Sequence, residues 1–285
     1  MSQSPPLHVP HDPQPPGNGF RPAAGELEVW PGITGPGADA RRDLYILVPP
    51  SYRSSDRRYP VLYMHDGQNL FDPALSFAGS WRVDRAMAVL AAEGLEAIIV
   101  GIPNLGARRL DEYGPFYDRT YRHGGRGAEY IDFVAGTVKP LVDRRLRTRP
   151  EPAATGLMGS SMGGLISLYG LAARPDVFSF AGALSPSLFF ARDRILGWLR
   201  TVPALRARVF VSMGTAEGAG RTAIKRWRRA HTHIARVQRL VRALEKKGLD
   251  PNRDIMRVVV HGGQHNETTW SAILPDALRF LLPRP

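Results

Sequence analysis

The chain has 285 residues, a formal net charge of +12 and no cysteine. The length suits one α/β domain with a full core, the absence of cysteine excludes disulfides and cysteine nucleophiles, and no apolar run is long enough to predict a membrane-spanning helix. Residues 1–22 contain six prolines between Pro5 and Pro16 and lack the basic and apolar regions of a signal peptide, which predicts a disordered tail. We therefore expect a single domain over residues 23–285, located in the cytoplasm.

After the tail, the sequence predicts two strands followed by an alternation of strands and helices. The predicted strands cover residues 27–30, 42–48, 59–64, 96–100, 153–158, 179–184, 207–213 and 254–260. The predicted helices cover residues 81–90, 127–147, 162–174, 193–201, 222–247 and 267–282, with a long polar loop at 103–126. This order predicts an α/β fold with a mostly parallel central sheet and helices on both faces.

A candidate nucleophile lies between the predicted strand at 153–158 and the helix at 162–174. Residues 159–163 read Gly-Ser-Ser-Met-Gly, the G-x-S-x-G pattern of a nucleophile elbow, in which a tight turn raises the central serine above the sheet. The pattern alone also fits an ordinary turn of glycine and serine. Ser161 is the predicted nucleophile, provided that a base and an acid follow it.

A candidate base comes from the histidines after Ser161, because the catalytic groups of α/β-hydrolases follow the chain order nucleophile, acid, histidine. His231 and His233 lie in a long arginine-rich helical stretch, which favours surface positions. His261 ends a predicted strand, where a hydrogen-bonded packing role is favoured, and His265 lies in the glycine-containing loop beyond it. His265 is therefore the predicted base.

Metal and cofactor sites are not expected. His261 and His265 are four residues apart, but this spacing brings two metal ligands together only on a helix, and the intervening Gly262-Gly263 disfavours one. The chain also lacks an H-E-x-x-H motif.

The acid should follow a strand between the nucleophile and the base. Glu217 comes three residues after Gly214, at the end of the predicted strand at 207–213, and could orient and stabilise the imidazole. Four other carboxylates in the interval are rival candidates; two flank a proline in a turn before a strand, and one begins a predicted helix. They are Asp176, Asp193, Asp250 and Asp254.

An oxyanion hole needs two backbone N–H donors. The backbone N–H of Met162, directly after the nucleophile, is the first predicted donor. The loop after the strand at 59–64 reads His-Asp-Gly-Gln-Asn over residues 65–69, and the Gln68 N–H is the predicted second donor. The alternative for this loop is an ordinary Asp-Gly turn.

Most of the positive charge is concentrated in one segment. Residues 221–248 contain ten lysines and arginines and a single acidic residue, Glu245. The same segment has apolar residues at helical spacing, so a solvated face of a surface helix is one interpretation. The alternative is a positive field that attracts an anionic substrate. No nucleic-acid-binding motif accompanies the charge, and we expect no nucleic-acid partner.

Taken together, these motifs resemble the putative-esterase family of the α/β-hydrolase superfamily, which includes enterochelin (siderophore) esterases and S-formylglutathione hydrolase-like enzymes. The resemblance covers roughly residues 42–282. It rests on the segments 59–69, 100–104, 109–113, 156–164, 183–187, 214–217 and 263–270. It implies that Asp66, Asn104, Arg109, Glu112 and Tyr113 line the site. For the last four, the alternative is a structural network of salt bridges and turns.

The motifs and the resemblance together predict a serine ester hydrolase that acts through an acyl-enzyme, without metal or cofactor. The predicted substrate is a small soluble ester, with an anionic, siderophore-type or aromatic acyl ester as the specific expectation. Two alternatives remain open from the sequence. One is an acyltransferase on the same scaffold, and the other is a binding protein that has kept the fold without catalysis.

Overall fold

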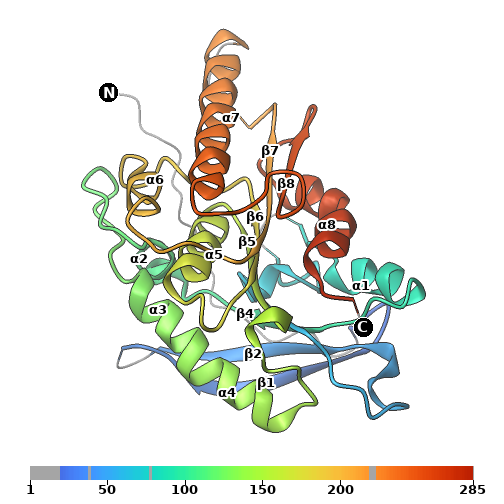
Figure 1. The fold of residues 1–285 in the computed structure, drawn as a ribbon. Helices are drawn as coiled ribbons and strands as arrows, with labels where there is room; N and C mark the ends of the chain where they lie inside the picture. Colours follow the sequence, from blue (N-terminus) through green and yellow to red (C-terminus); the bar gives the residue numbers. More distant parts are fainter. Residues whose placement is uncertain (1–19, 38–39, 77–78, 218–222, 285) are drawn as a thin grey trace.

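The computed structural model describes residues 20–284 apart from 38–39, 77–78 and 218–222 (Figure 1). The predicted disordered tail therefore lies largely outside the described residues. At the start of the described chain, Phe20 packs against the apolar core, and the backbone N–H of Ala23 donates to Asp84 Oδ2 at 2.9 Å.

Eight strands form one sheet, in the order β1-β2-β4-β3-β5-β6-β7-β8. Their bounds are Glu26–Thr34 (β1), Arg41–Val48 (β2), Val61–His65 (β3), Ile98–Ile102 (β4), Thr155–Ser160 (β5), Phe180–Leu184 (β6), Arg208–Gly214 (β7) and Ile255–Val260 (β8). β1 and β4 both pair antiparallel to β2, and every other pairing is parallel. This is the predicted α/β-hydrolase fold, with the antiparallel strands at the front of the chain.

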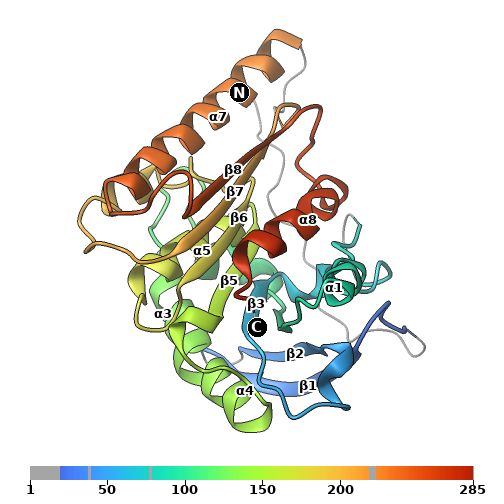
Figure 2. The same ribbon diagram turned by 45° about the vertical axis from the view of Figure 1, so that its right-hand side comes forward.

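Helices cover both faces of the sheet (Figures 1 and 2). Their bounds are Val83–Ala92 (α1), Arg109–Tyr113 (α2), Gly127–Phe133 (α3), Lys139–Arg145 (α4), Met162–Ala173 (α5), Arg194–Trp198 (α6), Ala223–Glu245 (α7) and Glu267–Leu281 (α8). α1 and α8 cover one face, whereas α3, α4, α5, α6 and α7 lie on the other. Among the described residues, no helix has the length and apolar character needed to cross a membrane.

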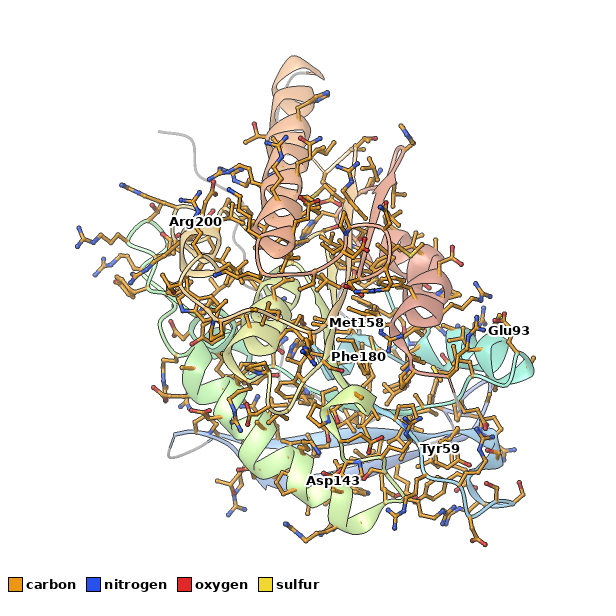
Figure 3. The ribbon with its side chains drawn as sticks, viewed as in Figure 1. Tyr59, Glu93, Asp143, Met158, Phe180 and Arg200 are labelled. Atoms are coloured by element: carbon orange, nitrogen blue, oxygen red, sulfur yellow. The ribbon has the colours of Figure 1, made fainter. Side chains whose placement is uncertain are left out.

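Each face of the sheet has its own apolar core, because side chains alternate between the faces of a strand. In β2, Leu44 and Ile46 belong to the core under α3 to α7, whereas Tyr45 and Leu47 belong to the core under α1 and α8. Figure 3 shows Met158 and Phe180 at the centre of the molecule, and both side chains are fully buried. The continuous apolar runs of the central strands thus reflect burial on both faces.

Two segments differ from the predictions. The expected polar loop at 103–126 contains α2, whose Glu112 and Tyr113 are buried, so its polar sequence did not reveal the helix. The expected helix at 127–147 consists of α3 and α4 joined by a π-helical turn at Val134–Val138 and ends at Arg145.

The carboxyl ends of the parallel strands bring the candidate residues to one edge of the sheet. Asp66 directly follows β3, Ser161 follows β5, and Ser185 follows β6. Glu217 and His265 come a few residues after β7 and β8, respectively. In open α/β sheets, ligands bind outside this edge.

Candidate active site

Ser161 occupies a strained turn between β5 and α5. Its backbone has φ 57° and ψ −119°, a conformation that costs a residue with a side chain of order 1–3 kcal/mol and that tends to occur at functional sites. The glycines of the motif allow the tight turn, since a Cβ on Gly159 would lie 2.8 Å from the carbonyl carbon of Gly163. The Ser161 N–H donates to the carbonyl of Leu184 on the neighbouring strand at 2.9 Å. The turn is therefore fixed to the sheet on the side of β6.

The two predicted oxyanion donors have unpaired N–H groups. Within the described residues, neither the Met162 N–H nor the Gln68 N–H has a protein acceptor, as is usual for the first N–H groups of a helix. The loop containing Gln68 is packed closely on the end of β4, because a Cβ on Gly67 would lie 2.7 Å from the Gly101 carbonyl carbon. Both donors thus lie on tightly packed backbone, as preorganised electrostatic stabilisation requires.

Glu217 and His265 form a hydrogen-bonded pair. His265 Nδ1 lies 3.0 Å from Glu217 Oε2; the carboxylate is 3% exposed and the imidazole 41% exposed. The other carboxylate oxygen, Oε1, accepts hydrogen bonds from the Gly214 N–H at 2.6 Å and from the Ser185 hydroxyl at 2.5 Å. Trp270 donates to the Ser185 oxygen at 3.0 Å, and its ring packs edge-on against His265. The pair is held by groups from β6, β7 and α8.

Ser161 is not joined to this pair by a hydrogen bond within the described residues. Its hydroxyl instead lies 3.1 Å from the Ser187 hydroxyl. Catalytic hydrogen bonds are often long or misaligned in unliganded enzymes and tighten in the substrate complex. The structure therefore brings Glu217 and His265 together. The hydrogen bond between His265 and the Ser161 hydroxyl stays a prediction.

Three of the four competing acids form ion pairs elsewhere. Asp176 pairs with Arg174 at 2.9 Å, and Asp254 pairs with Arg253 at 2.9 Å. Asp193 accepts from two arginines of α7. Of the other histidines, His231 and His233 lie on α7, and His261 follows β8 in an exposed turn.

Of the five residues implied by the family resemblance, three contact Asp66, and Glu112 pairs elsewhere. Arg109 donates to both carboxylate oxygens, at 2.7 and 2.8 Å, and Asn104 Nδ2 donates to Oδ1 at 2.7 Å. The Tyr113 hydroxyl accepts from the Asp66 N–H at 3.0 Å, while Glu112 pairs with the buried Arg42 at 2.7 Å. These contacts match the structural-network alternative; contact of these residues with substrate is still a prediction.

The electrostatics of this network favour an ionised Asp66. Burial raises the pKa of its carboxyl, but the charge and hydrogen bonds of Arg109 and the Asn104 amide outweigh burial and hold the pKa below its usual value. At the end of β3, directly before Asp66, burial lowers the pKa of His65 to about 3. A neutral His65 ring is therefore hydrogen-bonded through Nδ1 to the Tyr130 hydroxyl at 2.8 Å.

Several residues around the site had no predicted role. Ser185 and Trp270 position Glu217, and Ser187 contacts the candidate nucleophile. Glu267, the first residue of α8, is 7% exposed, and burial raises the pKa of its carboxyl. The sequence held a usable signal for the two serines: Ser185 and Ser187 follow the strand beside the nucleophile strand, at the same edge of the sheet.

Among the described residues, no group of three or more His, Asp or Glu side chains is placed to hold a metal ion.

Comparison with known proteins identifies relatives over nearly the whole chain. Residues 37–281 match the family model Esterase, described as putative esterase. The uncharacterized protein YbbA of Bacillus subtilis (strain 168) is 26% identical over 84% of this chain and 92% of its own length. The siderophore triacetylfusarinine C esterase of Aspergillus fumigatus is 34% identical, over 46% of this chain and 45% of its own length.

Solved structures share the fold. The siderophore hydrolase EstA from Aspergillus nidulans superimposes with a TM-score of 0.68 at 18% identity, covering 96% of this chain and 99% of its own. Since the family model covers most of the chain and the observed topology is that of the α/β-hydrolase fold, this chain belongs to the putative-esterase family.

Proposed function

We propose that this protein is a serine ester hydrolase that works through an acyl-enzyme. The observation that carries the proposal is the 3.0 Å contact between His265 Nδ1 and Glu217 Oε2, in an esterase-family chain whose strained turn contains Ser161. A carboxylate that is hydrogen-bonded to Nδ1 leaves Nε2 as the imidazole nitrogen that can accept a proton from a nucleophile. Family membership supports ester hydrolysis, and the three side chains supply the roles that a serine mechanism needs.

In this mechanism, Ser161 Oγ attacks the ester carbonyl while its proton passes to His265 Nε2. The N–H groups of Met162 and Gln68 donate to the oxyanion that develops on the carbonyl oxygen. His265 then returns the proton to the leaving alcohol, and the acyl group remains on Ser161. Water, deprotonated by the same imidazole, hydrolyses the acyl-enzyme and regenerates the serine.

The first step requires a rearrangement of the Ser161 side chain. Its hydroxyl must exchange the Ser187 partner for His265 Nε2, a motion that a side-chain rotation, with adjustment of the exposed imidazole, can provide. Glu217, by contrast, is already held by hydrogen bonds from the Gly214 N–H and the Ser185 hydroxyl. We infer that the acid is preorganised and that the link between nucleophile and base forms when substrate binds.

For the substrate, we propose a small ester of the siderophore type or with an aromatic acyl group. The support is similarity: the Aspergillus fumigatus relative is named as a siderophore triacetylfusarinine C esterase. The chain spans about half the length of that relative, so the substrate is inferred by likeness over a segment. The net charge of +12 further favours an anionic substrate over a cationic one.

The test combines active-site labelling with hydrolysis. A fluorophosphonate probe should label the wild type but neither Ser161→Ala nor His265→Ala, whereas Ser187→Ala, which removes a neighbouring hydroxyl, should keep the label. Loss of the nucleophile should also lower kcat by about 10⁴-fold or more. A folded wild-type protein that takes up no probe would overturn the serine mechanism.

A substrate panel then tests the second half of the proposal. Triacetylfusarinine C, enterobactin and p-nitrophenyl acetate, each with and without an added alcohol acceptor, distinguish the substrate classes and separate hydrolysis from acyl transfer. We expect hydrolysis of a siderophore ester as the main reaction. Turnover of p-nitrophenyl acetate alone would overturn the siderophore proposal and retain the hydrolase, and transfer to the alcohol in preference to water would identify an acyltransferase.

A further inference from the structure

A strongly basic groove lies between α6 and the C-terminal half of α7. Its central cavity has a volume of about 320 Å³, and five of its seven lining residues are lysine or arginine. These five are Arg200, Arg239, Arg242, Lys246 and Lys247. A second cavity of about 540 Å³ adjoins it and shares Arg200 and Arg239. Figure 3 shows Arg200 beside α6, on the flank of the molecule that carries α7.

Three of these cations lack an acidic partner within the described residues. Arg239 pairs with Asp193 at 2.9 Å, and Lys247 Nζ donates to the carbonyls of Arg200 and Val202 at 2.8 and 2.6 Å. The guanidinium groups of Arg200 and Arg242 and the ammonium of Lys246 form no ion pair in the described part of the chain. No carboxylate lines the central cavity, so the charges of Arg200, Arg242 and Lys246 converge there without an ion-pair partner among the described residues.

The position of the groove separates it from the candidate active site. Lys247 accepts a backbone hydrogen bond from Leu205, three residues before β7 begins at Arg208. The groove thus extends toward the amino ends of the strands, whereas Ser161 and His265 follow carboxyl ends. The lining of the central cavity also includes none of the candidate catalytic or oxyanion residues.

We propose that this groove binds a compact polyanion of the oligophosphate class. Arginine presents donors in a planar fork that matches phosphate oxygens, and lysine adds a point charge. A volume of about 320 Å³ is at the lower end of the roughly 300–1,000 Å³ typical of small-ligand sites. Arg200, Arg242 and Lys246 are the binding groups, and the bound anion relieves their mutual repulsion. This inference does not depend on the proposed esterase activity.

The experiment is isothermal titration of the full-length protein with inorganic tripolyphosphate, and separately with ATP, at low and at high salt. The test variant is Arg242→Gln/Lys246→Gln. The matched control is Arg41→Gln/Arg85→Gln, which removes the same charge from two exposed arginines on β2 and α1. Titration of Ser161→Ala separates binding in the groove from any event at the ester site.

We expect one tripolyphosphate per chain and an affinity that falls steeply with salt. The test variant should bind tripolyphosphate at least about tenfold more weakly than the wild type. The control variant and Ser161→Ala should bind within about twofold of wild type. Tighter binding of ATP than of tripolyphosphate would identify the nucleoside form of the ligand. Equal weakening in both double variants, or no binding by wild type at low salt, would overturn the proposal.

Discussion

The Ser185 hydroxyl donates to Glu217 Oε1 at 2.5 Å, while its oxygen accepts a hydrogen bond from Trp270 Nε1 at 3.0 Å. Glu217 thereby presents its other oxygen, Oε2, to His265. Ser185 directly follows β6, and Trp270 lies on α8. The carboxylate orientation consequently depends on the packing of a helix and a strand that are distant in sequence.

Ser185→Ala should therefore reduce catalysis without reducing substrate binding. Hydrogen bonds to charged groups contribute about 1.5–3 kcal/mol, so kcat should fall at least about tenfold while KM changes little. Steady-state kinetics on the best ester of the panel measures the split. Ser212→Ala is the control, because the hydroxyl of this buried serine has no hydrogen-bond partner among the described residues; it should keep wild-type kcat. A rise in KM with unchanged kcat for Ser185→Ala would contradict the positioning role.

The strained turn at Ser161 predicts a gain in stability from its removal. Glycine adopts φ 57° without the steric cost that serine bears. After the entropic cost of glycine, Ser161→Gly should be about 1 kcal/mol more stable than Ser161→Ala. Urea unfolding of the two inactive variants measures the difference. Equal stability would show that the turn stores no strain.

The fold could be predicted from the sequence because local patterns determine most of it. Buried strands such as β4 and β6 are short apolar runs, and the chain order of strands and helices fixes the fold class. α2 could not be predicted, because Glu112 and Tyr113 are buried through partners on other elements rather than through an apolar helical face. The prediction therefore failed where tertiary contacts, rather than a local pattern, determine the element.

The candidate site shows the same division. The turn at Ser161 and the pairing of Glu217 with His265 follow from motif and chain order. The contacts of Ser185 with Glu217 and Trp270 join residues 32 and 85 positions apart. Such contacts depend on the relative heights at which strands end, which no local pattern encodes.

Asp66 and Arg109 should be strongly coupled in stability. Their side chains are 8% and 20% exposed and form a two-pronged ion pair, and removing one partner of such a pair costs about 3–5 kcal/mol. Asp66→Asn and Arg109→Gln should each destabilise the fold, and the double variant should cost less than their sum by about 1–3 kcal/mol. Denaturant unfolding of the four proteins gives the coupling energy.

The same variants address the predicted substrate contact of Arg109. A structural role predicts lower stability with little change in KM for the protein that remains folded. A rise in KM at unchanged stability would instead support direct contact with substrate. Because the Asp66 pKa is held below its usual value, the contribution of the pair to stability is present above the unfolded pKa, near 4, and is lost on acidification.

His65 should make the fold sensitive to mild acid. Burial lowers its pKa from 6.5 to about 3, so between these values the unfolded chain binds a proton that the folded protein does not, and stability falls as pH falls. From pH 7 to 4.5 this linkage removes about 2.5 kcal/mol. His65→Asn should reduce the stability difference between the two pH values by that amount, whatever constant cost comes from losing the Tyr130 contact. Urea unfolding at both pH values measures it, with the exposed His261→Asn as control. A pH difference in His65→Asn equal to that of wild type would mean that His65 is protonated in the folded protein.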